Sequence, residues 1–211
     1  MSELPLLYSF RRCPYAIRAR LALSVAGVKT QLREIVLRDK PAEMLEVSSK
    51  ATVPVLVLGH QTIDESLDIM DWALGQHDPE GWLDMPQEGR ALIEQNDGPF
   101  KRALDRTKYA DRYDGDPEQE RETATQFLGT IAGIASNNAY LFGSSASLAD
   151  MALLPFVRQF AAIDRHRFDN DSPQWVQRWL DQFLQSERFT QVMKKYPKWR
   201  TGDAVTLFPE Y

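Results

Sequence analysis

The chain has 211 residues, of which 43% are hydrophobic and 26% charged, so it carries enough apolar surface for a folded core and is not disordered. Its formal net charge is −5 and no basic stripe is present, which argues against a nucleic-acid partner. A single cysteine excludes a disulfide framework and a cysteine-rich zinc site. The three histidines are isolated, so we expect no metal.

A membrane span is not expected. The longest uncharged run, residues 123–149, is interrupted by glutamine, asparagine, serine and glycine residues, which favours a buried helix followed by a loop. The N-terminal residues carry an acid where a signal peptide has basic residues. Together with the single cysteine, these features predict a cytoplasmic protein.

The first third of the chain predicts alternating strands and helices. Residues 4–10 are apolar enough for a buried strand, and Pro14 suits the first turn of a helix that ends at Gly27. A second strand is expected over residues 31–37 and a short helix over 41–48.

The next segment completes this pattern. Residues 51–58 form a β-rich run interrupted by Pro54, and residues 61–63 can return as a hairpin strand. A helix is then expected from about Glu65 to Gln76, capped by Asp64. The predicted order is β-α-β-α-β-β-α.

The rest of the chain predicts helices alone. Turn residues and Met85-Pro86 indicate a linker over residues 78–86. Beyond it, helices are expected over 87–113, 116–138, 147–160 with a kink at Pro155, from Pro173 onward, and over 190–195. The predicted domains are an α/β domain (1–77), the linker (78–86) and an all-α domain (87–211).

Cys13 is the strongest candidate for chemistry. It stands at the expected N-terminus of a helix, where backbone N–H groups and the helix dipole favour a thiolate. No carboxylate occurs between Glu3 and Glu34, whereas six basic residues do, and cationic neighbours also lower thiol pKa values. A lone cysteine is more often a small buried apolar residue, but this setting favours a reactive thiol.

Cys13 has no internal partner, because position 16, where a dithiol motif has its second cysteine, holds Ala16. Any disulfide that Cys13 forms must therefore involve an external thiol, and a small-molecule thiol is needed to release it. Glutathione is the obvious candidate.

At this point the residues resemble those of a known family. Cys13-Pro14-Tyr15-Ala16 after a strand, Val53-Pro54 before one, Glu65-Ser66 at a helix start and an all-helical second half resemble a cytosolic glutathione S-transferase. The resemblance covers nearly the whole chain and is greatest to the cysteine-type members, the omega class and the two-domain glutaredoxin-like proteins. It implies a thioredoxin-like domain followed by a helical bundle, and by analogy a homodimer.

The resemblance also implies site residues. Cys13, with Pro14 and Tyr15 beside it, would face the sulfur of glutathione, and Val53 before a cis Pro54 would pair with its cysteinyl backbone. Glu65 and Ser66 would bind the γ-glutamyl end, and Lys40 the glycyl carboxylate. Each has an ordinary alternative: a surface lysine at Lys40, capping residues at 65 and 66, and a strand breaker at Pro54.

Other residues compete for roles. Tyr8 or Ser9 could supply the activating hydroxyl that other members of the superfamily use, although Tyr8 is expected to point into the core. An electrophile pocket could use aromatic residues, but core positions are the simpler interpretation of Phe10, Tyr15, Tyr109 and Tyr113. Asp150 resembles the buried helix-capping acid of the family, which serves folding.

Two classes of function follow. The first is an enzyme that transfers thiols through a Cys13–glutathione mixed disulfide, reducing a disulfide, a glutathionylated thiol or a small oxidant such as dehydroascorbate. Conjugation of glutathione to a small electrophile is a variant of this class. The second is a catalytically silent binding protein with the same fold. The presence of every expected glutathione-binding residue argues against this second class.

Overall fold

The computed structural model describes residues 4–210. The chain divides into two compact units, one formed by Met1–Pro79 with Ser186–Tyr211 and the other by Glu80–Gln185. Each unit has its own buried core, and we describe them separately.

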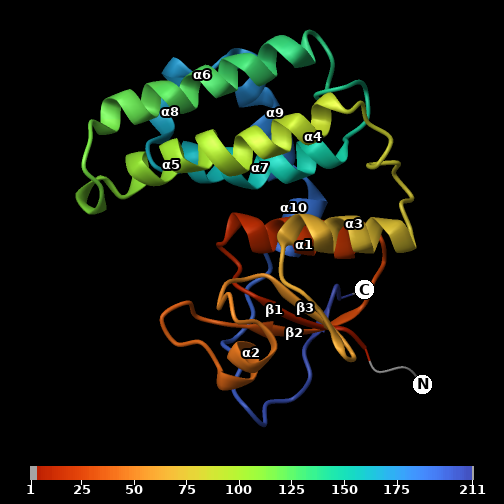
Figure 1. Cartoon of the computed structure of the whole chain (residues 1–211). Coiled ribbons are helices and arrows are strands. Elements are labelled where there is room, and N and C mark those ends of the chain that lie inside the picture. Colours follow the sequence, from red (N-terminus) through yellow and green to blue (C-terminus); the bar gives the residue numbers. More distant parts are fainter. Residues whose placement is uncertain (1–3, 211) are drawn as a thin grey trace. The chain divides into compact units, whose positions relative to one another are not determined.

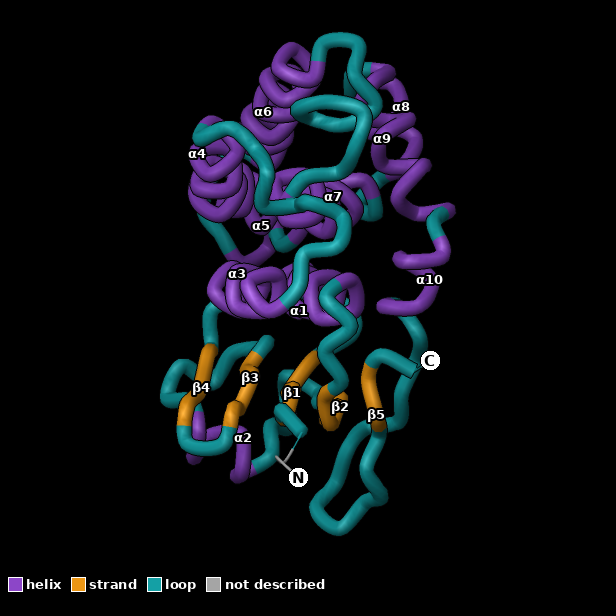
Figure 2. Tube along the Cα trace, turned by 90° about the vertical axis from the view of Figure 1, so that its right-hand side faces the viewer, coloured by secondary structure: helices purple, strands orange, loops and turns teal. Residues whose placement is uncertain are grey.

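The first unit is built on a sheet (Figure 1), and within residues 4–210 its five strands have the order β4-β3-β1-β2-β5 (Figure 2). The strands are β1 (Leu6–Ser9), β2 (Thr30–Glu34), β3 (Val55–Leu58), β4 (Gln61–Ile63) and β5 (Leu207–Phe208). β1 and β2 are parallel, and the other neighbours are antiparallel. β1 is therefore central, so the loop that follows it opens at the middle of the sheet.

Helices cover both faces of this sheet. They are α1 (Pro14–Val25), α2 (Ala42–Val47), α3 (Ser66–Gln76) and α10 (Glu187–Val192). α1 and α3 lie together on one face and α2 on the other (Figure 2). Pro14 begins α1, and Gly27, whose φ is +69°, terminates its C-terminal turn as expected.

The core beneath α2 includes the edge of the candidate site. Its buried members come from β1, α1, α2, β3 and the residues next to β2 and β3, and they are Tyr8, Ala16, Ile35, Met44, Val53 and Val55. Cys13 packs against this cluster while staying only partly buried. The thiol is thus held by hydrocarbon on one side.

The second unit is helical. Its helices are α4 (Glu88–Gln95), α5 (Lys101–Lys108), α6 (Pro117–Ala135), α7 (Leu148–Ala161), α8 (Arg165–Asp171) and α9 (Gln174–Gln185), with a π-helical turn η1 (Asn96–Phe100) and a short 3-10 turn η2 (Ala110–Arg112). α7 is buried along almost its whole length, which fits its mostly apolar sequence. Phe100 and Phe160 pack edge to face in the core of this unit.

The fold class is confirmed, whereas some predicted elements are wrong. The continuous helix over 87–113 is interrupted by η1, because Pro99 lacks the N–H that a regular α-helix needs there. The expectation of no strand after the linker is wrong, since β5 pairs Phe208 with Thr30. As a result, the chain from Ser186 onward belongs to the first unit rather than to the helical one.

The predicted linker is also partly structured. Trp82 is fully buried in the second unit, and its carbonyl accepts the N–H of Leu148 at 2.8 Å. The division between the units falls between Pro79 and Glu80. Among residues 4–210, no helix is both long and apolar enough to cross a bilayer.

Candidate functional site

Cys13 occupies the N-cap position of α1. The backbone is extended there, with φ −75° and ψ 124°, and the Cys13 N–H donates to the Phe10 carbonyl at 2.9 Å. The side chain makes no capping hydrogen bond, and the first turn of α1 contains no acid. The positive end of the helix therefore meets the thiol without a competing carboxylate in that turn.

Val53 supplies the second wall of this site. Its carbonyl lies 3.7 Å from the Cys13 Sγ, which donates to it. The Val53–Pro54 peptide bond is cis, as the resemblance implied, and both residues are buried just before β3. The structure thus brings Cys13, Pro14 and the Val53-Pro54 pair together at the end of β1.

The N-terminus of α3 forms the third part. Glu65 is the N-cap residue and Ser66 the first residue of the helix, yet the Glu65 side chain makes no capping hydrogen bond. Four other helices have an N-cap residue whose side chain accepts a backbone N–H of the first turn: α6, α7, α8 and α10. Glu65 therefore occupies the N-cap position without capping through its side chain, which leaves the first-turn N–H groups of α3 unoccupied by it.

Two basic residues at this helix start were missed by the sequence analysis. The Lys50 Nζ lies 2.5 Å from a Glu65 oxygen and 3.0 Å from an Asp64 oxygen. Arg18, fully buried in α1, donates from Nη1 to the Ser66 Oγ at 3.4 Å. The only sequence signal for Arg18 was the basic composition of the segment before Glu34, and Lys50 had none, because their contacts span 48 and 15 positions of the chain.

The region around Lys50 is further ordered by Ser48. Its hydroxyl donates to Asp64 at 2.7 Å, and this hydrogen bond is the main cause that lowers the pKa of Asp64. The hydrogen bond to Glu65 is likewise the main cause that raises the pKa of Lys50. The Glu65 carboxylate thus lies exposed at the N-terminus of α3, paired with Lys50.

Lys40 stands apart from these residues. It is half-buried in the segment between the Val36–Asp39 β-bridge and α2, and within residues 4–210 no ion pair involves it. Within residues 4–210, no hydrogen bond or ion pair joins Lys40 to Cys13, Val53 or Ser66. Tyr15 is half-buried on α1, and the Arg18 guanidinium lies 5.6 Å from its ring centre.

The competing hydroxyl groups are sequestered. Tyr8 is 1% exposed, and its hydroxyl accepts from Arg33 Nη1 at 2.6 Å. Burial raises the pKa of Tyr8, with Arg33 opposing it. Ser9 is fully buried and accepts from Arg20 Nε at 2.9 Å. Neither hydroxyl is arranged to activate an external thiol, and the expectation that Tyr8 points into the core is confirmed.

The other aromatic candidates fall in different places. Phe10 packs against the core cluster beside Cys13. Tyr109 and Tyr113 lie in the second unit, where Arg112 and Arg106 stack on their respective rings. Asp150 is fully buried and caps α7 through a capping box with Ser147, so its expected folding role is confirmed.

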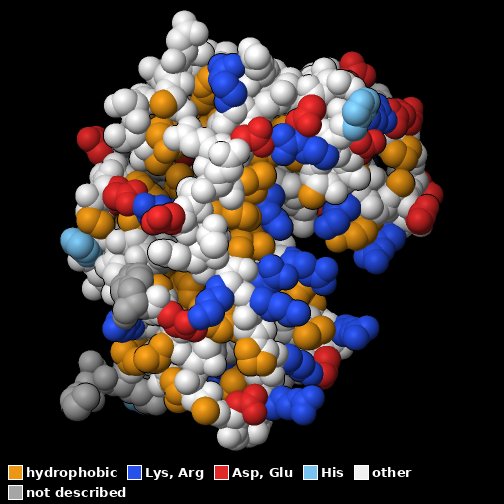
Figure 3. All heavy atoms as spheres, turned by 180° about the vertical axis from the view of Figure 1, so that it is seen from behind, with side chains coloured by type: hydrophobic (Ala, Val, Ile, Leu, Met, Phe, Trp, Pro, Cys, Tyr) orange, Lys and Arg blue, Asp and Glu red, His pale blue; other side chains and the backbone are white. Residues whose placement is uncertain are grey.

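Several basic residues lie near Cys13 in the chain. In the space-filling view, Lys and Arg side chains gather over one edge of the first unit (Figure 3). Arg12 stacks on Phe10 at 5.2 Å, next to Cys13 in the chain. No group of three or more metal-binding side chains occurs in the described part of the chain.

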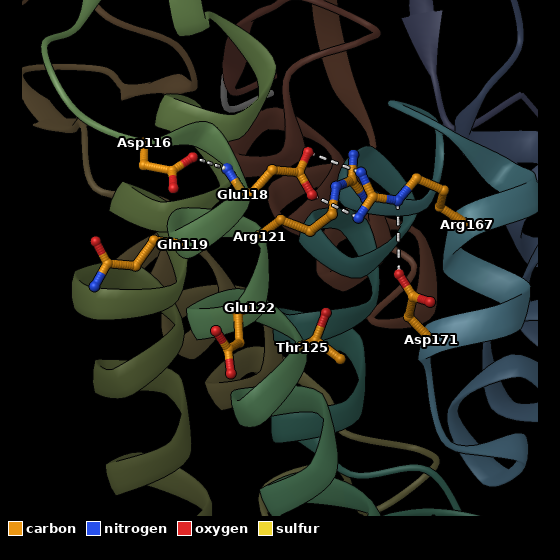
Figure 4. A pocket seen from close by; sticks show the side chains of 8 residues that line it. All are labelled: Asp116, Glu118, Gln119, Arg121, Glu122, Thr125, Arg167 and Asp171. Carbon is orange, nitrogen blue, oxygen red and sulfur yellow. Dashed lines mark hydrogen bonds and ion pairs between the residues drawn. The ribbon is translucent and has the colours of Figure 1, made fainter.

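A separate cavity of about 720 Å³ lies in the second unit at the start of α6 (Figure 4). Glu118 accepts two hydrogen bonds from Arg167, which also faces Asp171, and Arg121 points toward the same carboxylate. Arg167 is therefore paired with two carboxylates of the cavity lining, those of Glu118 and Asp171. It contains no thiol and none of the predicted site residues.

The sequence matches a known family over most of its length. Residues 7–81 match the family described as glutathione S-transferase, N-terminal domain, and residues 91–182 match glutathione S-transferase, C-terminal domain. A relative from Arabidopsis thaliana, glutathione S-transferase DHAR3, chloroplastic, is 25% identical over 182 residues, which cover 84% of this chain and 67% of that protein.

Solved structures show the same fold. Glutathione transferase Omega 3C from Trametes versicolor aligns with a TM-score of 0.77 and 20% identity, covering 93% of this chain and 91% of that one. A glutathione transferase family member from Pseudomonas fluorescens pf-5, solved with two glutathione bound, aligns with a TM-score of 0.76 and 19% identity, covering 90% and 92%.

Proposed function

Because the chain belongs to the cytosolic glutathione S-transferase superfamily, we propose that it is a glutathione-dependent thiol transferase acting through Cys13. Membership and the named relatives support glutathione as its substrate and a transferase activity. The single observation that carries the finer proposal is the position of Cys13, a partly exposed thiol at the uncapped N-terminus of α1.

Glutathione would bind along the surface from Val53 to α3. The Val53 backbone would pair with the cysteinyl residue as an added strand, next to the Cys13 sulfur. The exposed Glu65 carboxylate would accept the γ-glutamyl ammonium, and the first-turn N–H groups of α3 with the Ser66 hydroxyl would bind its α-carboxylate. Lys40 would meet the glycyl carboxylate.

The reaction would proceed in two exchanges. The Cys13 thiolate attacks the glutathione sulfur of a mixed disulfide, a new S–S bond forms, and the substrate sulfur leaves as a thiolate that takes up a proton. A second glutathione thiolate then attacks the glutathione sulfur on Cys13, releasing oxidised glutathione and restoring the Cys13 thiolate. The second substrate in these exchanges is a glutathionylated thiol or another disulfide that contains glutathione. A small oxidant such as dehydroascorbate would instead take two electrons and two protons from two glutathione molecules, which leave as one oxidised glutathione.

The first test is intact-mass spectrometry after incubation with oxidised glutathione. We expect the mass to increase by one glutathionyl group on the sole cysteine, and reduced glutathione to reverse it. A parallel substrate panel should show turnover of glutathionylated thiols or dehydroascorbate. An unmodified protein that turns over a chloroaromatic electrophile would instead indicate conjugation, and an unmodified inactive protein would indicate a binding function.

The second test concerns recognition of the γ-glutamyl end. We expect Glu65→Gln to weaken binding of S-methylglutathione by about tenfold, because a charge-assisted hydrogen bond to the ammonium contributes roughly 1.5–3 kcal/mol. Isothermal titration calorimetry measures the change. S-methylglutathione serves as the probe because it cannot form a disulfide with Cys13.

The matched control is Asp68→Asn, which removes a charge from the exposed face of the same first turns of α3. If the loss reflects only the field at the helix terminus, both variants will weaken binding equally. We expect the control to bind within about twofold of the native chain. Equal losses in the two variants, or none in Glu65→Gln, would contradict the assignment of Glu65.

A further inference from the structure

The Glu34 side chain joins segments that are distant in the chain. Glu34 ends β2 and is 9% exposed. Its Oε1 accepts the backbone N–H of Arg11 at 2.7 Å, and its Oε2 accepts from Arg20 Nη2. Its own carbonyl accepts the N–H of Trp199 at 2.8 Å. One residue thus holds the loop before Cys13, helix α1 and the C-terminal segment.

Arg20 completes the connection from inside α1. It is fully buried, and each of its three nitrogens has a recorded acceptor. Nε donates to the Ser9 hydroxyl at 2.9 Å, and Nη1 donates to the Val192 carbonyl at 3.0 Å. The guanidinium is therefore fixed between the last residue of β1 and the last residue of α10.

The neighbouring rings do not replace Glu34 as a counter-charge. Arg20 lies 5.9 Å from the ring centre of Tyr196 and 5.7 Å from that of Phe208. Burial raises the pKa of Tyr196 to about 12, so its hydroxyl is neutral at physiological pH. Burial raises the pKa of Glu34 as well, but Arg20 opposes this rise. The carboxylate is the group that both balances Arg20 and accepts from the loop.

The loop between β1 and α1 has few other anchors. The Ser9 carbonyl accepts from the Ile35 N–H at 2.8 Å, and the Phe10 carbonyl accepts from the Cys13 N–H at 2.9 Å. The Arg11 N–H is the donor between these two, and its acceptor is the Glu34 carboxylate. Loss of this bond removes the hydrogen bond between Arg11 and β2, although the Arg11 side chain still donates from Nη1 to the Met193 carbonyl at 3.5 Å.

We propose that Glu34 and Arg20 are positioning residues for the Cys13 thiol, because their buried ion pair fixes the loop that sets Cys13 at the N-terminus of α1. This inference rests on the proposed function in one respect, that Cys13 is the reacting thiol. Stability alone does not explain the pair, since apolar residues of similar volume are often as stabilising as a buried ion pair. Apolar residues cannot accept the Arg11 N–H.

The test exploits that difference. The double variant Arg20→Met with Glu34→Leu removes both buried charges and fills their volume, so the chain should fold, but the Arg11 N–H loses its acceptor. The readout is alkylation of the sole cysteine by iodoacetamide as a function of pH. We expect the rate at neutral pH to fall about tenfold and the pH midpoint to rise, as the thiol leaves the field of α1.

Two comparisons make the result decisive. Leu74→Ala, in the buried core of α3 away from the loop, lowers stability without touching Arg11 and should alkylate as the native chain does. If the double variant does not fold, Glu34→Gln replaces it, because one amide oxygen cannot serve both donors in full. We expect that variant to alkylate about threefold more slowly.

Several outcomes would overturn the proposal. A folded double variant that alkylates at the native rate excludes a positioning role, as does an unchanged rate in Glu34→Gln. A pH midpoint that falls in Glu34→Gln would mean that the carboxylate acts only through its charge. Alkylation requires no glutathione, so these results are independent of the mass-spectrometric test of thiol transfer.

Discussion

Replacement of Cys13 by serine is expected to abolish the glutathionyl adduct and to slow thiol transfer by about a thousandfold or more. A thiolate is the attacking group in disulfide exchange, and a serine hydroxyl does not ionise at neutral pH even at a helix N-terminus. Cys13 is the sole cysteine, so no other thiol can substitute for it. Steady-state turnover of a glutathionylated peptide, with glutathione as reductant, measures the loss.

The matched control for this variant is Tyr8→Phe. It removes the hydroxyl that other members of the superfamily position near this strand end, and in this chain that hydroxyl is buried against Arg33. We expect turnover within about twofold of the native rate, because the tyrosine ring that fills the core is kept. Substantial thiol transfer by Cys13→Ser, or loss of thiol transfer in Tyr8→Phe, would mean that the Tyr8 hydroxyl and not the Cys13 thiol is the catalytic group.

Removal of the Asp150 carboxylate should lower the stability of the protein far more than removal of an exposed helix cap. Its Oδ1 accepts from the Leu141 N–H at 3.0 Å and from Trp179 Nε1 at 2.9 Å, and its Oδ2 accepts from the Ser147 N–H at 2.8 Å and hydroxyl at 2.6 Å. Asp150→Ala leaves these donors buried without an acceptor. We expect the free energy of unfolding to fall by about 3–5 kcal/mol, measured by urea denaturation.

Asp116→Ala is the control for this prediction. Asp116 also caps a helix in the second unit, since it accepts the Glu118 N–H at 2.9 Å, but it is exposed to solvent. Water can replace the lost acceptor there, so we expect a decrease of about 1 kcal/mol. Similar losses in the two variants would show that Asp150 contributes only as a cap and not as the acceptor that joins α7 to α9.

The local elements could be predicted because their signals are local. Pro14 at the start of α1, the Ser147–Asp150 capping box and the strand at 61–63 each depend on residues within one turn or one hairpin. The position of Cys13 at a helix N-terminus follows from the same kind of signal. These features therefore appear in the structure where the sequence places them.

The sequence could not assign the C-terminal segment. A two-residue strand such as Leu207–Phe208 has no periodicity of its own, and it forms because the edge of β2 offers unpaired backbone groups. The full burial of Arg18 and Arg20 was likewise not predicted, since the sequence showed them only as members of a basic segment. Their acceptors lie on other elements, so their burial could not be inferred from neighbouring residues.

The sequence by itself determined the candidate thiol, the helix start that presents it and the order of the elements from β1 to α3. Only the tertiary structure decided how that group is held: the Val53 carbonyl beside the sulfur, Lys50 on Glu65, and Glu34 between Arg11 and Arg20. The reason is physical, because propensity and capping act over a few residues, whereas these contacts form when distant segments meet in the fold.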